Sequence, residues 1–287
     1  MATSRAFVNL ADVNKIGFAI AKVISVCPNQ KARVPSYLLH LLLSPAFHAE
    51  SAATNPKSKP HLVSSAQLCT NHTIDDLLGH HILSVINFPR KQIGRIMSDC
   101  LTTGVQDVDA EPEMKRNTTV FVELSRSNNS ESSGYNTKVR EDLNGISVGI
   151  LGHKKIVGVM DRDLTWDEFA AVDIRVGTVI SPEAVSMNSS NNEDMDQDPY
   201  TRVLRYRVDF GSNLGTLNTG IVWRGEMREG EGDAAGIVGK QVLAVVNLNV
   251  GELESIFGHG ARAAILTAGG LDTVQPALAV KNGYILC

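Results

Sequence analysis

The sequence predicts an all-β protein built from two tandem β-barrels of about five strands each. The chain has 287 residues, which is enough for two domains of about 100 to 150 residues. Short apolar runs alternate with turn clusters, and little of the sequence has helical period. In addition, one segment of the first half returns in the second half, and such an internal repeat indicates a duplicated domain.

The repeat has a constant spacing of 160 residues (239 − 79). Residues 79–87 return as residues 239–247, with a glycine at the start and an asparagine at the end of both runs. Gly17 returns as Gly177 at the same spacing. We therefore expect a tandem duplication, in which one copy serves as a control for the other.

Runs rich in Val, Ile, Leu and Thr predict the strands. In the first copy they cover residues 16–24, 37–43, 61–68, 82–87 and 118–124. In the second copy they cover residues 176–180, 203–210, 217–223, 242–247 and 263–267. Five short strands at this spacing are typical of a small closed or nearly closed barrel. Short helices are expected at residues 74–78 and after Thr165, which has capping-box spacing to Glu168.

The domain boundaries follow from the repeat and from composition. We expect a first domain at residues 1–150, a linker at 151–163 and a second, divergent domain at 164–287. The Asn-Gly pair at residues 144–145 corresponds to the pair at residues 282–283. Polar inserts at residues 49–60, 125–137 and 186–199 contain too few apolar residues for a core, so we expect mobile loops there.

The composition excludes several classes of protein. The sequence contains no run of 18 or more apolar residues, so no membrane span is predicted. The first residues contain no apolar signal core. A cytoplasmic protein is therefore expected. Cys27, Cys69, Cys100 and Cys287 are far apart and form no Cys-x-x-Cys pair, which argues against a zinc knuckle and a disulfide scaffold. No cofactor, metal site or catalytic triad is indicated, so an enzyme is not expected.

The first copy contains three further motifs, namely Ala32-Arg33-Val34-Pro35, Ser64-Ser65-Ala66-Gln67, and residues 85–94 (Val-Ile-Asn-Phe-Pro-Arg-Lys-Gln-Ile-Gly) together with Ser98. In this combination they resemble the CsaA-type tRNA-binding domain family. This OB-fold module also occurs in structure-specific tRNA-binding proteins and at the C-terminus of some methionyl-tRNA synthetases. The second copy keeps mainly residues 173–177, 208–211 and 239–247.

The resemblance implies a five-stranded OB-fold barrel that normally works as a homodimer and binds tRNA without catalysis. Some bacterial members of the family have been assigned a protein-export chaperone role. Two copies in one chain would place both halves of that dimer in one polypeptide, as an intrachain pseudo-dimer with a pseudo-twofold axis.

The candidate RNA-binding surface lies on the first copy. Cations neutralise phosphates, hydroxyl and amide groups contact sugars and base edges, and aromatic rings and guanidinium groups stack on unpaired bases. Between residues 87 and 104, three cations face one acid, Asp99. The alternative interpretation is that this segment only ends a strand and that its cations are solvated. The candidate residues are Arg33, Ser64, Ser65, Gln67, Asn87, Phe88, Arg90, Lys91, Gln92, Arg95 and Ser98.

The second copy lacks this polar surface. Between residues 247 and 269 its charged residues are Glu252, Glu254 and Arg262, and residues 217–220 (Leu-Asn-Thr-Gly) stand where the first copy has residues 64–67. Residues 1–125 carry 12 basic and 10 acidic residues, whereas residues 160–287 carry 10 and 18. Phosphate is therefore expected to bind the first copy, and the second copy is expected mainly to complete the pseudo-dimer.

The formal net charge of −4 favours local binding with a modest dependence on salt. Two functions remain open at this point. The chain binds tRNA or structured RNA, or it is a protein-interaction or chaperone-like module that binds unfolded or partner polypeptides in a groove between the barrels. Weakening of binding by salt indicates the first function, and salt-insensitive binding of polypeptide indicates the second.

Overall fold

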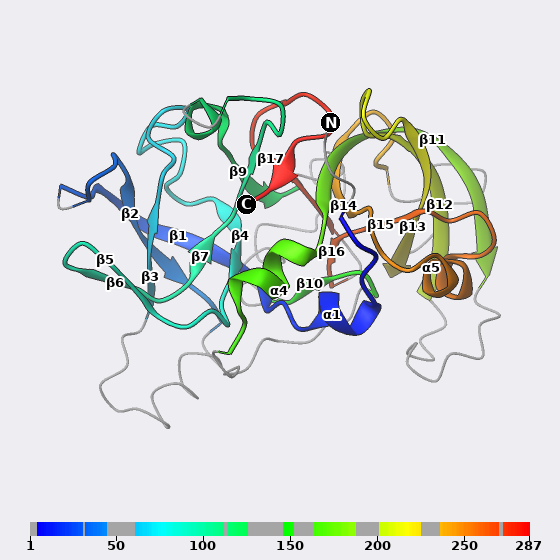
Figure 1. Cartoon of the computed structure of the whole chain (residues 1–287), viewed down its shortest axis with the longest axis horizontal. Coiled ribbons are helices and arrows are strands. Elements are labelled where there is room, and N and C mark those ends of the chain that lie inside the picture. The colour runs from blue at the N-terminus through cyan, green and yellow to red at the C-terminus, as the bar shows by residue number, and fades with distance from the viewer. Residues whose placement is uncertain are drawn as a thin grey trace, which may run out of the picture.

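Strands make up most of the regular structure of the chain (Figure 1). The computed structural model describes residues 5–30, 32–44, 61–111, 114–125, 146–151, 163–187, 201–224, 236–269 and 272–287. The first half comprises α1 (Leu10–Asn14), β1 (Phe18–Pro28), β2 (Tyr37–Leu42), β3 (Leu62–Ala66), β4 (His81–Val85), β5 (Lys91–Ile93), β6 (Ile96–Ser98), β7 (Leu101–Thr102), β8 (Gly104–Gln106), the 3-10 helix η1 (Lys115–Thr118), β9 (Val120–Leu124) and β10 (Val148–Gly149). The second half comprises α4 (Trp166–Ala171), β11 (Ile174–Met187), β12 (Thr201–Asp209), β13 (Thr216–Arg224), β14 (Gln241–Val245), α5 (Val250–Phe257), β15 (Ala263–Ile265), β16 (Thr267–Ala268), β17 (Asp272–Pro276) and β18 (Ile285–Leu286).

Five strands of the second half close into a barrel. β11 pairs with both β12 and β14, β12 pairs with β13, and β15 joins β13 to β14. Along β12 the buried residues Leu204, Tyr206 and Val208 alternate with the more exposed Arg205 and Arg207. Because successive side chains of a strand point to opposite faces, the apolar set fills the barrel and the arginines face outward. The prediction of an all-β fold with a five-stranded barrel is confirmed.

The first half has the same order of strands. β3, β2, β1, β4 and β7 follow one another, with β1 in the place of β11 and β7 in the place of β15. β3 is tied to the segment before β7 by two hydrogen bonds. The Asp99 N–H donates to the Val63 carbonyl (2.6 Å), and the Val63 N–H donates to the Asp99 carboxylate (3.0 Å).

Three antiparallel ladders join the two halves, namely β10 with β16, β18 with β8, and β9 with β17. In Figure 1 β9, β10, β16 and β17 lie near the middle of the molecule, with β2 and β3 on the left and β11 and β12 on the right. One buried cluster takes side chains from both halves, including Phe18 and Val122 from the first and Ile174 and Val274 from the second. The two halves therefore share a core in addition to the separate cluster that each contains.

Some expected elements differ from the observed ones. Residues 74–78 form hydrogen-bonded turns instead of a helix, with the Leu77 and Leu78 N–H groups donating to the Ile74 carbonyl (3.2 and 3.1 Å). The helix expected after Thr165 is present as α4, and its capping box is formed. Residues 49–60, 126–137 and 188–199 of the polar inserts, and residues 152–162 of the linker, lie outside the described residues.

The two halves repeat the same hydrogen bonds, but at two different spacings. The Gly17 N–H donates to Asn87 Oδ1 (2.9 Å), and the Asp173 N–H donates to Asn247 Oδ1 (2.8 Å). Asp173 therefore takes the place of Gly17 at a spacing of 156 residues (173 − 17), whereas the two asparagines are 160 residues apart (247 − 87).

The prediction that Gly177 corresponds to Gly17 is consequently wrong. Gly177 pairs with Val242 on β14, and Ala21 pairs with the equivalent residue, Ile82, on β4. A Cβ atom at position 177 would lie 2.5 Å from a Val208 side-chain atom, so packing in the barrel explains this glycine. The second half has four more residues between its first and fourth strands, which shifts the register of the repeat.

The register of the third strand also differs from the prediction. Ser64 pairs with Leu39, and Thr219 pairs with Tyr206, in ladders that are otherwise equivalent. Residues 64–67 therefore correspond to residues 219–222 instead of 217–220. Gly220 takes the place of Ser65, so the second half has no hydroxyl at this position.

Candidate nucleic-acid interface

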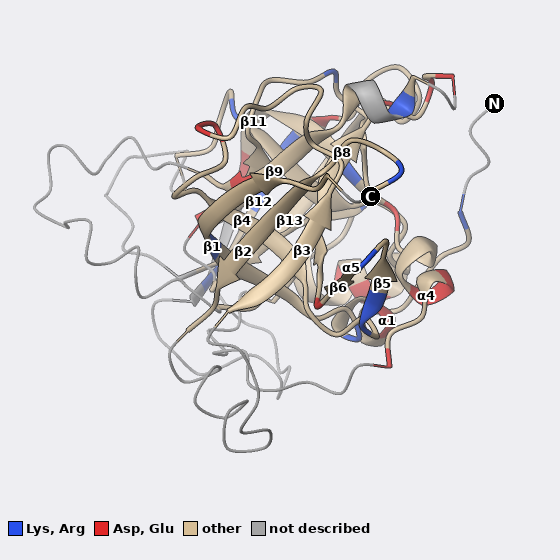
Figure 2. Ribbon diagram, turned by 90° about the vertical axis from the view of Figure 1, so that its left-hand side faces the viewer, with Lys and Arg blue, Asp and Glu red and all other residues tan. Residues whose placement is uncertain are grey.

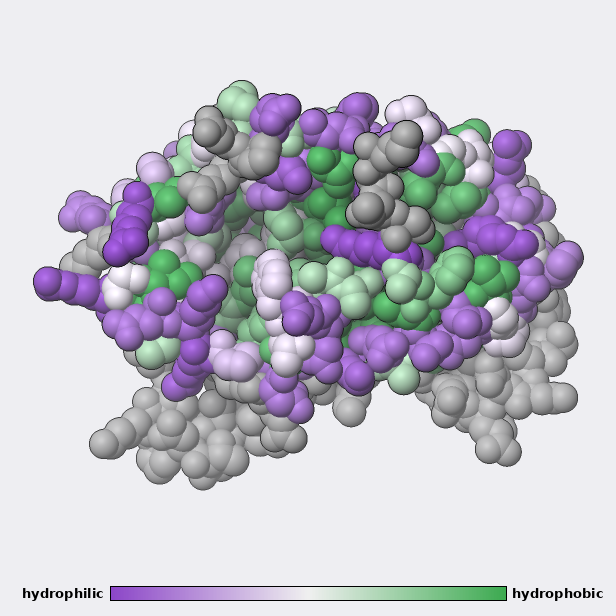
Figure 3. Space-filling view, viewed as in Figure 1, coloured by the Kyte–Doolittle hydropathy of each residue, from purple (hydrophilic) through white to green (hydrophobic). Residues whose placement is uncertain are grey.

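A hollow of about 690 Å³ lies where the first half meets the start of the second half. Its walls come from β3, from the segment 88–93, from β7 and β8, and from residues 163–166 before and within α4. Figure 3 shows that the face carrying α1 and α4 is hollowed between the halves and that hydrophobic residues lie inside. Of the predicted site residues, the lining includes Ser65, Gln67, Phe88, Arg90, Lys91 and Ser98.

A second hollow of about 350 Å³ adjoins the first, because both are lined by Ser65, Gln67 and Ile93. Its other side carries Arg33, which is exposed. The Ser65 hydroxyl lies 3.1 Å from Asn29 Nδ2 and 3.3 Å from Ser36 Oγ, so its position is fixed by a small polar network. The structure thus brings Arg33, which is distant in sequence, to the same surface as residues 65–67 and 88–98.

Phe88 stacks on Trp166, with ring centroids 5.9 Å apart and an angle of 29° between the planes. Phe169 packs against both rings, at 5.6 Å from Phe88 and 5.4 Å from Trp166. Trp166 nevertheless keeps 58% of its surface exposed. An aromatic ring from the second half therefore forms part of the wall of a hollow that is built mostly by the first half.

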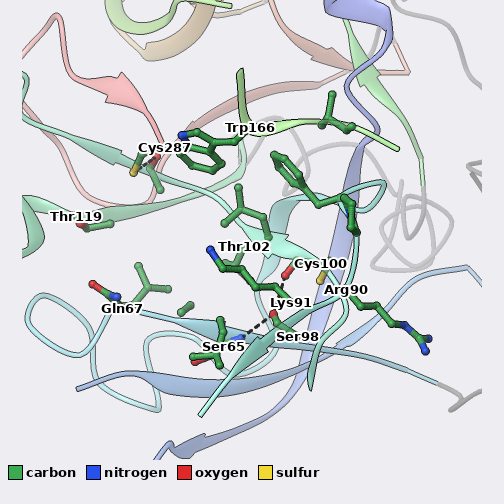
Figure 4. A pocket seen from close by; sticks show the side chains of 18 of the residues that line it. Ser65, Gln67, Arg90, Lys91, Ser98, Cys100, Thr102, Thr119, Trp166 and Cys287 are labelled. Atoms are coloured by element: carbon green, nitrogen blue, oxygen red, sulfur yellow. Dashed lines mark hydrogen bonds between the residues drawn. The ribbon is translucent and has the colours of Figure 1, made fainter. Parts of the chain in front are cut away.

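The cations at the hollow have different surroundings. Figure 4 shows the Lys91 side chain lying across the hollow, whereas Arg90 is directed away from it. Arg90 Nε lies 2.9 Å from Asp99 Oδ1, and this pair holds Arg90 beside the buried end of β6. Asp163 also lines the hollow, and Figure 2 shows the basic residue of β5 at the same corner of the molecule as the acidic residues of α4. Acidic side chains therefore lie close to the cations of the hollow, which confines the excess positive charge to a small part of the surface.

Ser64 and Asn87, like Ser98, are buried instead of lying on the surface. Ser64 is 1% exposed, and its hydroxyl donates to the Cys100 carbonyl (3.2 Å) and accepts from the Thr102 hydroxyl (2.9 Å). Asn87 is 2% exposed; its amide accepts from the Gly17 N–H (2.9 Å) and donates to the Lys15 carbonyl (2.7 Å). Both side chains satisfy polar groups within the fold, so we leave them out of the candidate contact surface.

Asn87→Ala is expected to destabilise the fold without lowering the affinity of the folded protein for its ligand. The substitution leaves the Gly17 N–H and the Lys15 carbonyl without their partner, and each unsatisfied buried group costs about 1–3 kcal/mol. Urea denaturation should show a loss of about 2–4 kcal/mol, while ligand affinity of the folded protein stays unchanged. A variant of normal stability with weakened binding would contradict this structural role.

The other predicted residues lie on the β5–β6 hairpin. Gln92 and Arg95 are exposed and line neither hollow, and Gln92 Nε2 donates to the Gly94 carbonyl at the turn (3.2 Å). Ser98 is buried at the end of β6, where its hydroxyl donates to the Cys100 carbonyl (3.0 Å). Ser98 therefore shapes the wall of the hollow, and Arg95 extends the cationic edge beyond it.

The equivalent face of the second half is covered by α5. Asn249 begins this helix by accepting a hydrogen bond from the Gly251 N–H (2.9 Å), and the helix stands where the first half has the β5–β6 hairpin. Phe257, which is 1% exposed, packs on Gly220, where a Cβ atom would lie 2.0 Å from the ring. A serine such as Ser65 would not fit beneath this ring. The face that is open in the first half is thus filled by a side chain in the second.

Sequence reasoning did not predict that residues 163–166 and Cys287 line the hollow. Each lies far along the chain from residues 65–102, and only the packing of the second half against the first brings them there. The Cys287 thiol donates to the Gly104 carbonyl (3.3 Å), and burial raises its pKa to about 12. Cys287 is therefore a neutral wall residue and not a reactive thiolate.

In the described part of the chain, no group of three or more His, Cys, Asp or Glu side chains could hold a metal ion. Within the same residues, no helix is both long and apolar enough to cross a membrane. The hollow offers aromatic faces, hydroxyl and amide groups, and a cation.

Comparison with known proteins gives partial matches. No protein-family model matches the chain. In sequence, it is 31% identical over 126 residues to the methionine–tRNA ligase of Porphyromonas gingivalis, a match that covers 42% of this chain and 15% of the ligase. The chain thus spans 15% of the length of this curated relative.

Two solved structures are CsaA proteins. The CsaA chaperone protein from Picrophilus torridus has a TM-score of 0.31 and 24% identity, covering 40% of this chain and 87% of that protein. Chaperone CsaA from Bacillus anthracis has a TM-score of 0.32 and 23% identity, covering 42% and 93%. In sequence, the resemblance that the motifs predict is confirmed: two-fifths of the chain is similar to part of a methionine–tRNA ligase.

Proposed function

We propose that the chain binds tRNA or another structured RNA without catalysing a reaction, and that the contact surface lies on the first half. The observation that carries the proposal is the meeting of three separate motifs at two adjoining hollows. Arg33, residues 65–67 and residues 88–91 line them together. The similarity to part of a methionine–tRNA ligase, an enzyme that acts on a tRNA, supports the same function.

Each part of this surface suits one part of an RNA. Arg33 and Lys91 are exposed cations that can neutralise phosphates. Ser65 and Gln67 present a hydroxyl and an amide between them, and such groups contact ribose hydroxyls and base edges. With so few cations, the logarithm of the affinity should fall with the logarithm of salt concentration with a slope of about −2 to −3.

The proposed architecture is a tandem duplication, with domains at residues 1–150 and 164–287 joined by a linker at 151–163. Equivalent hydrogen bonds support it. The Leu164 N–H donates to the Asn87 carbonyl (3.3 Å), and the Val8 N–H donates to the Asn247 carbonyl (2.9 Å). In each half, the N-terminal segment thus bonds to the asparagine that follows the fourth strand of the other half.

A pseudo-twofold axis is proposed through the β9–β17 ladder. β8 pairs with β9 as β16 pairs with β17, which makes β9 and β17 equivalent strands. In their own ladder Glu123 lies opposite Gln275, and the flanking pairs are Val122 with Pro276 and Leu124 with Val274. This pairing is self-complementary, as expected for a twofold contact between two copies of one domain.

The second half is proposed to support the first without a comparable RNA surface. Phe257 fills the place that is open in the first half, and the excess of acidic residues in this half repels phosphate. One RNA molecule per chain is therefore expected, although the pseudo-dimer contains two domains.

The second candidate function is binding of unfolded or partner polypeptide in the groove between the halves. The apolar wall of the hollow, with Phe88, Leu101 and Leu164, favours it. Fluorescence anisotropy of labelled total tRNA, titrated over a range of salt concentrations beside a labelled, reduced and alkylated polypeptide, separates the two functions. Saturable tRNA binding that weakens with salt supports RNA binding. Absence of tRNA binding at low salt, with salt-insensitive binding of the polypeptide, would contradict it.

A further inference from the structure

We propose that Trp166 and Phe88 form a stacking platform for one unpaired nucleobase of the bound RNA. This inference rests on the proposed RNA-binding function and assigns a residue of the second half to the binding site. Trp166 lines the hollow and stacks on Phe88 at 5.9 Å, yet 58% of its surface remains exposed. Bases stack on exposed aromatic side chains in proteins that bind single strands, and here Phe88 supports the exposed ring from one side.

The platform is held in place by the fold. The Thr165 hydroxyl accepts from the Glu168 N–H (3.2 Å), and the Glu168 carboxylate accepts from the Thr165 N–H (2.9 Å), which fixes the first turn of α4. The bond from the Thr165 N–H, and a second one that the Thr165 hydroxyl donates to the same carboxylate (2.8 Å), lower the pKa of Glu168 because they stabilise its charged form. Phe169, on the buried face of α4, anchors the helix in the shared core. A ligand therefore meets a ring that is already positioned, and little ordering is needed on binding.

The surroundings of the platform match a nucleotide. The hollow of about 690 Å³ is large enough for a base with its ribose. Gln67 and Ser65 lie on the β3 wall, where they can contact the polar edge of a base, and Lys91 lies across the hollow as a partner for a phosphate. A nucleotide has an aromatic face, a polar edge and a negative charge, so it uses all three features.

The equivalent place in the second half has no such platform. Leu10 stands in the place of Trp166, because the segments that contain Val8 and Leu164 make equivalent hydrogen bonds. Leu248 likewise stands in the place of Phe88, directly after the equivalent asparagine. The aromatic pair thus occurs only at the hollow that also carries Lys91, while the opposite face has an aliphatic pair beside Glu252, whose carboxylate accepts from the Leu10 N–H (2.8 Å).

Tryptophan fluorescence tests the platform directly, because Trp166 and Trp223 are the two tryptophans of the chain. Trp223 Nε1 has no hydrogen-bond partner among the described residues, so Trp223→Phe removes no bond seen there. In the Trp223→Phe variant we expect a short single-stranded RNA to quench Trp166 fluorescence, and an abasic ribose-phosphate oligomer of equal length to leave it unchanged. Equal quenching by both, or none by the RNA, would overturn the platform.

Affinity for total tRNA gives the second readout. Trp166→Ala should weaken binding about tenfold, Trp166→Phe should restore most of it, and Leu10→Ala, at the equivalent position, should leave it unchanged. If Trp166→Ala binds tRNA normally while Arg33→Ala/Lys91→Ala does not, the platform is wrong and the RNA-binding function stands. If the unmodified chain binds no tRNA, both are wrong.

Discussion

Asp173→Ala is expected to lower the free energy of unfolding by about 3–5 kcal/mol, because it leaves the buried charge of Arg175 without its counterion. Asp173 and Arg175 are 5% and 6% exposed. Their side chains form a bidentate pair, with Arg175 Nε 2.5 Å from Oδ1 and Arg175 Nη2 2.9 Å from Oδ2. Burial lowers the pKa of Arg5, and the nearby Asp173 carboxylate partly opposes this shift. Without Asp173, two cations would lose their counterion.

Urea denaturation of the single variant and of Asp173→Ala/Arg175→Met measures this effect. The double variant removes both members of the pair, so it should regain a large part of the lost stability. If the single variant lost less than about 1 kcal/mol, the value typical of an exposed pair, the ion pair would not be buried as described. This pair belongs to the second half alone, since the equivalent positions in the first half are Gly17 and Ala19.

Arg33→Ala/Lys91→Ala is expected to weaken tRNA binding on the order of tenfold at low salt and to reduce the salt slope by about two. Both side chains are exposed at the two hollows. The pair leaves the Arg90–Asp99 contact intact, so the fold should not be disturbed. Anisotropy titrations with total tRNA at several salt concentrations measure both quantities.

Arg207→Ala/Lys281→Ala is the matched control. It removes the same formal charge from exposed positions of the second half. If general attraction between RNA and any cation drives binding, both double variants will weaken it equally. That outcome would contradict a specific surface on the first half.

The strands could be predicted from the sequence because each keeps a run of β-branched and aliphatic residues that fills a core. β2 and β12 begin within two residues of their expected positions, at Tyr37 and Thr201. The register between the halves could not be predicted, because a constant spacing conceals the four additional residues before β14. The helix expected at residues 74–78 is absent, and the turns there end at Gly79, which has a positive φ of 82°.

The candidate site was predictable where side chains stay on the surface. Arg33, Gln67 and Lys91 come from three motifs and meet at adjoining hollows. Asn87 was misplaced, because an asparagine after a strand has the same sequence signature whether it faces solvent or bonds to buried backbone groups. Trp166 was missed for a different reason. Its role depends on packing between halves, and its own segment indicates only a helix start.

The central claim is that RNA contacts the first half together with α4. Ultraviolet cross-linking of the full chain to total tRNA, followed by mass spectrometry of the linked peptides, tests it most directly. We expect cross-linked peptides from residues 61–69 and 88–98 and from the segment with Trp166. Cross-links confined to residues 201–224 and 250–262 of the second half would contradict the account.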